Sequence, residues 1–268
     1  MSTDTTPRHP IGEVAAITGV NPVTLRAWQR RFGLLKPGRT PKGHRLYSDV
    51  DIDRIRQILS WLDKGVAISR VRSLLEDPSA DAPDDPWLAH QEQLTQAVFD
   101  LNLDKLMHEL DQLTSLYTFE LTLARALRPW LESLQHRVQE RVDGALMLKW
   151  AEHQLHSFLH GHCSRGQSRL PGKSSLLLML RTSPLEAAFT AVSLTQQGVK
   201  FSQLPTDSLS GCQLLSPHTL LLCLPAKLDS SERQILTQLQ ERGVPLVAVG
   251  PFAVLHKDDP LFMELTND

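Results

Sequence analysis

The chain has 268 residues, of which 41% are hydrophobic, and a formal net charge of −2. This length and composition fit two or three compact domains and exclude a small disulfide-stapled one. No run approaches the roughly 20 apolar residues of a membrane-spanning helix, and the polar start lacks the apolar stretch of a secretory signal. We therefore expect a cytoplasmic protein with no membrane partner. Cys163, Cys212 and Cys223 show no metal-binding spacing and are expected to be structural thiols.

The charge is distributed unevenly along the chain. An acidic, proline-rich stretch at residues 78–86 has the composition of a linker. Residues 1–77 hold thirteen Lys and Arg against eight Asp and Glu, whereas the remainder holds 15 against 22. Between Pro22 and Tyr47 there are seven Lys or Arg and no acidic residue. A basic segment without acidic residues favours a polyanionic partner. The alternative interpretation is a basic surface that only faces solvent.

Two short helices are predicted at the start of this basic region. Apolar residues at helical spacing precede Gly19, which ends the first helix. Asn21 is a suitable N-cap, and Pro22 suits the first position of a second helix that continues through Arg31. Two short helices joined by a glycine-containing turn predict a helix-turn-helix whose second helix can enter a major groove.

The segment that follows predicts a hairpin and two more helices. Lys36–Tyr47 is too rich in Pro and Gly for a helix and suits a β-hairpin wing. Ser48 and Asp51 form a capping box that opens a longer helix, which ends at Gly65. A further short helix is predicted at Val66–Glu76.

The run IGEVAAITGVNPVTLRAWQRRFGLLKP and the GRTPKGHRLYSDVDIDRI after it resemble the MerR family of winged-helix transcription regulators. The resemblance implies that the second helix enters the major groove while the wing grips the backbone. Contacts at or near base edges then fall to Pro22, Thr24 and Arg26. Contacts to phosphate fall to Trp28, Arg30, Arg39, Lys42, His44, Arg45 and Tyr47. Aromatic residues at helical spacing usually pack, so the core of this domain is the alternative place for Trp28 and Tyr47.

Residues 87–163 predict a four-helix bundle. Apolar residues recur at helical spacing, and the helical segments include Phe119–Glu140, interrupted at Pro129, and Gly144–His162. A second linker is expected at residues 164–173.

The apolar residues of 174–268 do not follow the helical spacing seen in residues 87–163. Near-continuous apolar runs, typical of buried parallel strands, alternate with helical stretches. The runs are Ser175–Leu180, Val199–Leu204, Thr219–Leu224 and Leu246–Val249, and the helices are Leu185–Gln197 and Ser230–Arg242. The chain is thus expected to be multidomain, with an all-α winged helix-turn-helix head, a four-helix bundle and an α/β flavodoxin-like domain. Ligand sites of such sheets lie beyond the strands' carboxyl ends, here Arg181–Glu186, Pro205–Asp207, Leu224–Lys227 and Gly250–Pro251.

This domain order resembles the cobalamin-type MerR regulators, which include light-sensing repressors of carotenoid genes and their biofilm-regulating relatives. The resemblance implies a Glu-His pair facing the corrin, which Glu152 and His153 match, and a Trp ten residues earlier, where this chain has Val142. It also implies an Asp-x-His-x-x-Gly motif after the first strand. Those three positions hold Arg181, Ser183 and Glu186.

The cobalt-ligand motif is therefore degenerate. Ser183 cannot ligate cobalt as imidazole does, and Glu186 places a charged side chain where glycine lets the nucleotide tail pass. Of a later Gly-Gly turn only Gly250 remains. We expect a B12-binding-like domain without a cofactor, with cobalamin binding as the alternative. The residues expected to be vestigial are Glu152, His153, Ser183, Glu186 and Gly250.

A histidine cluster is a weak metal-site candidate. His153, His156 and His160 share one face of a helix, and His136 or Cys163 would have to supply a further ligand. We favour the alternative, a solvated, histidine-rich helix end.

The sequence as a whole predicts a DNA-binding transcription regulator that is not an enzyme. We expect a homodimer on a pseudo-palindromic promoter in double-stranded DNA, with RNA polymerase nearby and a C-terminal region for dimerisation or sensing. The alternatives are a cobalamin- or metal-responsive sensor and a corrinoid-dependent enzyme module. The enzyme is disfavoured because the cobalt ligand is absent and no catalytic constellation replaces it. Activation and repression both remain open.

Overall fold

The computed structural model describes residue 6 and residues 8–76, 86–215 and 217–265. The chain forms two compact units, Met1–Ala151 and Glu152–Asp268, and their boundary falls inside helix α9 (Gly144–Gln167). Among these residues, no helix is both long and apolar enough to cross a membrane.

The first unit begins with the predicted helix-turn-helix. Helix α1 (Ile11–Thr18) ends at Gly19, whose φ of 69° lies in the left-handed region that glycine adopts readily. Helix α2 (Pro22–Phe32) begins after Asn21, whose side chain accepts a hydrogen bond of 2.7 Å from the backbone N–H of Val23. The predicted N-cap and the predicted helix pair are both confirmed.

Three short strands form an antiparallel sheet in the head. Strands β2 (Gly38–Arg39) and β3 (Arg45–Tyr47) pair as a hairpin, and β1 (His9–Pro10) pairs with the other edge of β3. The expectation of an all-α head is therefore wrong. Strand β1 gave no signal because two residues, one of them a proline, show no alternating pattern.

Two further helices complete the head. Helix α3 (Asp49–Asp63) starts at the predicted capping box, in which the Asp51 carboxylate accepts a hydrogen bond of 2.9 Å from the backbone N–H of Ser48. Its apolar face packs against α1 and against α4 (Ile68–Glu76). The linker predicted at residues 78–86 lies outside the described residues except for its last position, which opens the next helix.

The middle of the chain is helical, as predicted. Helix α5 (Pro86–Phe99) packs against α6 (Leu103–Leu116) and α8 (Arg128–Val138). The fourth member of the expected bundle stays a prediction, because α9 passes from the first unit into the second.

The interruption predicted at Pro129 is present as a change in helix type. A short helix, α7 (Phe119–Thr122), continues into the π-helical turn η1 (Leu123–Leu127), and α8 follows directly. The proline ring and its missing N–H disturb the regular hydrogen-bond ladder of the preceding turn.

Helix α9 continues through Gln167, so the first part of the predicted linker at 164–173 is helical. Tertiary contacts hold this last turn in place. The side-chain amide of Gln167 donates hydrogen bonds of 2.9 Å to the Thr195 hydroxyl and to the Val199 carbonyl. The linker prediction considered composition only and could not include these contacts.

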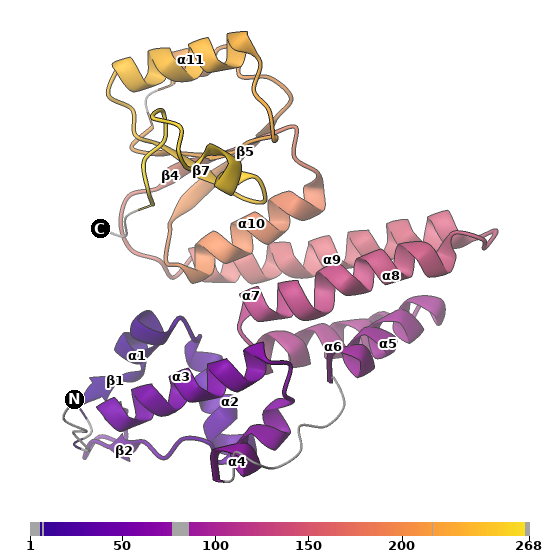
Figure 1. Ribbon diagram of the computed structural model, residues 1–268, viewed down its shortest axis with the longest axis vertical. Helices are drawn as coiled ribbons and strands as arrows, with labels where there is room; N and C mark the ends of the chain where they lie inside the picture. The colour runs from indigo at the N-terminus through magenta and orange to yellow at the C-terminus, as the bar shows by residue number, and fades with distance from the viewer. Residues whose placement is uncertain (1–5, 7, 77–85, 216, 266–268) are drawn as a thin grey trace. The chain divides into compact units, whose positions relative to one another are not determined.

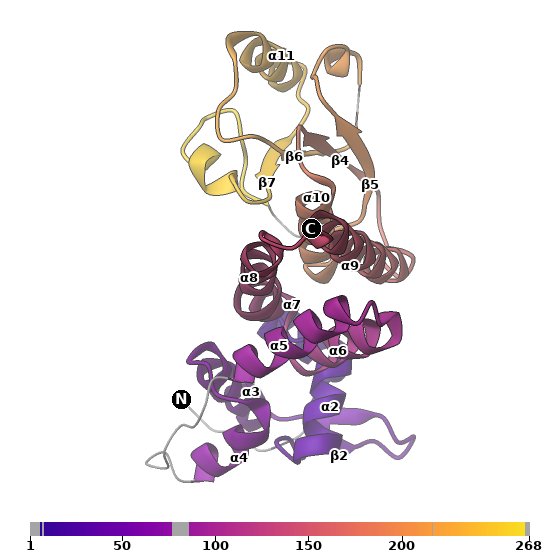
Figure 2. The ribbon, with the colours of Figure 1, turned by 90° about the vertical axis from the view of Figure 1, so that its right-hand side faces the viewer.

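The second unit contains the predicted parallel sheet. Its strands are β4 (Ser175–Leu180), β5 (Phe201–Thr206), β6 (Leu220–Cys223) and β7 (Leu246–Val249). They run parallel in the order β5-β4-β6-β7, which Figure 2 shows. Relative to chain order this is 2-1-3-4, an order of doubly wound folds. Helices α10 (Pro184–Gln196) and α11 (Ser230–Glu241) lie on opposite sides of the sheet (Figure 1).

Alternate strand residues face the two sides of this sheet. Leu178 and Leu222 belong to a buried cluster with Leu236 and Leu239 of α11. Strand β5 is an edge strand, and its residues 202–205 are exposed. Short 3₁₀ turns, η2 (Cys212–Leu214) and η3 (Ala253–His256), lie in the connections.

Candidate nucleic-acid interface

Arginine side chains line the exposed face of α2. Arg26 and Arg30, one helical turn apart, are both solvent-exposed, and Arg31 is exposed beyond them. Pro22, at the start of the helix, is partly buried. Because this segment of the chain carries no acidic residue, nothing within it offsets the positive charge of this face.

Two residues that the family resemblance assigns to DNA are buried inside the protein instead. Thr24 and Trp28 are both 0% exposed. The indole Nε1–H of Trp28 donates a hydrogen bond of 2.7 Å to the backbone carbonyl of Leu116, the last residue of α6. The assignment of Trp28 to a phosphate and of Thr24 to a base edge is therefore corrected, since a buried side chain cannot reach either one.

Tyr47 requires the same correction. It is 0% exposed, and its hydroxyl has no hydrogen-bond partner among the described residues. Burial raises the pKa of the Tyr47 hydroxyl, while the charges of Arg45 and Arg26 act in the opposite direction. Tyr47 thus belongs to the core of the head, and the two arginines lie close enough to it to influence its ionisation.

The β2–β3 hairpin carries further basic side chains. The Nε–H of Arg45 donates a hydrogen bond of 2.7 Å to Oε1 of Gln29, which ties the hairpin to α2. Arg39, Lys42 and His44 are exposed around the hairpin turn. Sequence reasoning gave Gln29 no role, and no local signal could have found its contact with a residue 16 positions away.

We call this set the basic face. It consists of Arg26, Arg30, Arg39, Lys42, His44 and Arg45. One helix and one hairpin, joined by a side-chain hydrogen bond, present all six positions. Arginine and lysine in such an arrangement can bind phosphate oxygens and, in a groove, base edges.

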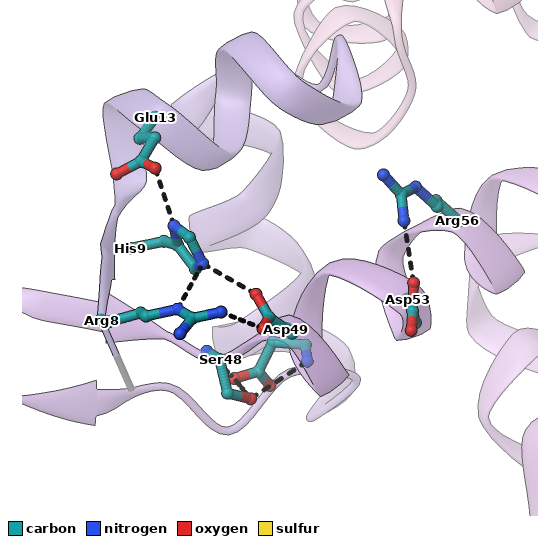
Figure 3. A network of polar contacts seen from close by, with 8 residues as sticks. Arg8, His9, Glu13, Ser48, Asp49, Asp53 and Arg56 are labelled. Atoms are coloured by element: carbon teal, nitrogen blue, oxygen red, sulfur yellow. Dashed lines mark hydrogen bonds and ion pairs between the residues drawn. The ribbon is translucent and has the colours of Figure 1, made fainter. Parts of the chain in front are cut away.

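A polar network that the sequence did not indicate fixes the start of the head (Figure 3). The His9 ring contacts Glu13 Oε1 through Nδ1 and Asp49 Oδ1 through Nε2, both at 2.8 Å. Arg8 also bonds Asp49. The hydrogen bonds to Glu13 and Asp49 raise the pKa of His9 above its ordinary value. The network joins β1 to α1 and to the start of α3.

The positions that correspond to a cobalt-ligand loop are engaged within the protein. The Ser183 hydroxyl caps α10, accepting a hydrogen bond of 3.3 Å from the backbone N–H of Glu186. Arg181 pairs with Glu232 of α11 at 2.5 Å, so a salt bridge spans the segments that leave β4 and β6. A Cβ placed on Gly250 would lie 2.6 Å from Cys223 Sγ.

None of these positions offers an imidazole that could serve as a lower cobalt ligand. The hydroxyl of Ser183 replaces the ring nitrogen, and the Arg181–Glu232 pair occupies the point at which the strand order reverses. Glu152 and His153 are exposed on α9.

The metal candidate gains no support from the structure. His156 and His160 stack with ring centroids 6.3 Å apart. Within the described ranges, no group of three or more His, Cys, Asp or Glu is arranged to hold a metal ion.

Comparison with known proteins places this interface in a family. Residues 10–77, which include α1, α2 and the β2–β3 hairpin, match the model described as the MerR HTH family regulatory protein. The HTH-type transcriptional regulator MlrA of Escherichia coli K12 is 34% identical over 251 residues, which cover 90% of this chain and 98% of that protein.

Two other relatives match more locally. MlrA of Salmonella typhimurium SL1344 is 53% identical over 98 residues, which cover 37% of this chain and 40% of that protein. The HTH-type transcriptional repressor CarH of Myxococcus xanthus is 45% identical over 67 residues, which cover 25% of this chain and 22% of that protein.

Proposed function

The chain belongs to the MerR family of DNA-binding transcription regulators, and from that premise we propose that the basic face binds one half-site of a promoter. The observation that carries the proposal is the bond between Arg45 of the hairpin and Gln29 of α2, which holds the hairpin cations and the helix cations in one arrangement. Double-stranded DNA offers phosphates along its backbone and base edges in its major groove, and this surface has cations for both.

The residues of the basic face divide into two roles. Arg26 lies in the first half of α2, the part of a recognition helix that reaches base edges, so we assign it to sequence readout. Arg30, Arg39, Lys42, His44 and Arg45 are assigned to the DNA backbone. Pro22 is assigned to positioning of the helix start near the bases.

We further propose a homodimer on a pseudo-palindromic promoter with RNA polymerase nearby. One head carries one helix of the recognition type, and two-fold operators are read by two such helices about one turn of DNA apart. Activation and repression are both compatible with this arrangement.

The second unit is proposed to serve sensing or dimerisation without cobalamin. The capping role of Ser183 and the Arg181–Glu232 salt bridge support this, because both occupy positions that the cofactor would need. A cobalamin-responsive sensor is the competing function, and the spectrum of protein purified with added cobalamin separates the two, since bound corrin absorbs visible light.

A footprint of the full chain on the DNA upstream of its own gene tests the main proposal. We expect wild type to protect a two-fold symmetric segment and Arg26→Ala to weaken or redistribute that protection. Arg169→Ala removes the same charge from the second unit and serves as the matched control. Equal footprints for the two variants would contradict the role of α2.

A further inference from the structure

The second unit contains a cavity of about 230 Å³ between α9, α10 and strands β4 and β5. Leu159, Met179, Ala188 and Ala191 form much of its wall. We propose that this cavity binds a small, uncharged organic molecule with an apolar body and a hydrogen-bonding group. The inference rests on the proposal that the second unit receives a signal, and it adds the chemical class of the molecule received.

The polar groups of the cavity come mainly from one helix. His156, His160 and Cys163 of α9 line it, and Gln203 of β5 completes this side, with its Nε2 3.9 Å from Cys163 Sγ. These groups can both donate and accept hydrogen bonds. A ligand with a hydroxyl, an amide or a ring N–H would therefore find a partner next to the apolar wall.

The absence of permanently charged side chains from the lining sets the class of ligand. Among the described residues that line the cavity there is no Asp, Glu, Lys or Arg. Burial, together with the charges of His160 and His153, lowers the pKa of His156, and burial raises the pKa of the Cys163 thiol. Both shifts favour the neutral forms of these two groups, and a charged ligand would lose its hydration without gaining a carboxylate, ammonium or guanidinium partner in the lining.

Size separates this cavity from a nucleotide or corrin site. A volume of about 230 Å³ is below the roughly 300–1,000 Å³ of pockets for drug-sized ligands, so the ligand has on the order of ten non-hydrogen atoms. The cavity lies on the β5 side of β4, and Thr182 and Pro184 of its lining flank Ser183 in the loop after β4. Helix α9, which supplies four lining side chains, also contributes its first eight residues to the first unit.

The test uses 2-naphthol, which is uncharged near neutral pH and has one hydroxyl, and 2-naphthoate, which has the same rings and a negative charge. Fluorescence titration of the full chain without DNA is expected to give saturable 2-naphthol binding with a Kd of about 10–100 μM, an ordinary efficiency for a ligand of this size. Binding of 2-naphthoate should be at least about tenfold weaker because its carboxylate would be desolvated.

Two variants place the binding in the cavity. Ala188→Leu fills part of the volume and should weaken 2-naphthol binding at least about tenfold, whereas Ala226→Leu, on the exposed loop after β6, should leave it unchanged. His160→Phe keeps a flat ring but removes its nitrogens, so it should weaken 2-naphthol binding about fivefold. It replaces Ala188→Leu as the test if that variant does not fold. Equal binding of the two probes, no saturable 2-naphthol binding, or insensitivity to both cavity variants would overturn the proposal. Because DNA is absent, these outcomes do not depend on the half-site proposal.

Discussion

The indole N–H of Trp28 on α2 donates a hydrogen bond to the carbonyl of Leu116, 88 residues further along the chain. The contact joins the recognition-type helix to the carboxyl end of α6, and both lie in one compact unit. Opposite faces of α2 thus have different tasks. The arginine face remains open to solvent, while the Trp28 face anchors the helix to the rest of the unit.

Trp28→Phe should therefore destabilise the first unit rather than remove a DNA contact. The substitution leaves the buried Leu116 carbonyl without this donor, and such a loss costs about 1–3 kcal/mol. The free energy of unfolding in urea, compared between wild type and variant, measures this loss. Trp61→Phe, on partly exposed α3 surface, is the matched control with a smaller expected effect. A normal unfolding midpoint combined with a reduced salt dependence of DNA binding would return Trp28 to the phosphate contacts.

Tyr47→Phe is expected to preserve DNA affinity and to raise stability by up to about 1 kcal/mol. The buried hydroxyl has no partner among the described residues, so its removal relieves an unsatisfied polar group while the ring keeps its packing. Thermal unfolding and a DNA titration on the same preparation check both parts. A clear loss of affinity would mean that the hydroxyl reaches DNA after all.

Arg45→Ala should weaken binding to all DNA sequences and lower the slope of log affinity against log salt by about 1, as for one lost phosphate contact. Gln29→Ala removes only the group that positions Arg45 and should lower affinity with little change of slope. Titrations over a range of salt concentrations distinguish the two residues. An unchanged slope for Arg45→Ala would assign it to packing of the hairpin.

The His9 network predicts a pH dependence of stability. Because the hydrogen bonds to Glu13 and Asp49 raise the folded-state pKa of His9, the folded form binds this proton more tightly than the unfolded form. The stabilisation is complete below the ordinary value of 6.5 and is lost as pH rises through the folded-state pKa. Denaturation of wild type and His9→Gln between about pH 6 and pH 9 should show their difference shrinking with pH.

Proton NMR provides a direct control for this assignment. Glu13→Gln removes the main cause of the shift and should bring the His9 titration back toward its ordinary value. A His9 pKa at or below 6.5 in wild type would show that the network does not form in solution.

Equilibrium dialysis with adenosylcobalamin and methylcobalamin should show no retention by wild type, and DNA affinity should be equal in light and dark. The triple change Arg181→Asp, Ser183→His and Glu186→Gly should give at most weak retention, since Val142 and the Gly250-Pro251 turn remain altered. Micromolar retention by wild type would require the second unit to be reinterpreted as a cobalamin sensor.

The helices and strands of this protein were largely determined by sequence signals that act over a few residues. The N-cap at Asn21, the capping box of Ser48 and Asp51, and the apolar strand Ser175–Leu180 each depend on near neighbours in the chain, and each is observed where it was predicted. The predicted strands agree with the observed ones to within two residues at each end. The charge distribution and the family pattern, which are also properties of short stretches of sequence, indicated DNA as the partner.

Only the tertiary structure decided which side chains remain available for function. The burial of Trp28 and Tyr47 and the pairing of Arg181 with Glu232 depend on residues that are distant in the chain. A helical pattern states which residues share a face, but the element that packs on that face is chosen by the free energy of the whole fold. For this reason the sequence predicted the recognition helix, whereas its anchored face and the cavity beside α9 emerged only from packing.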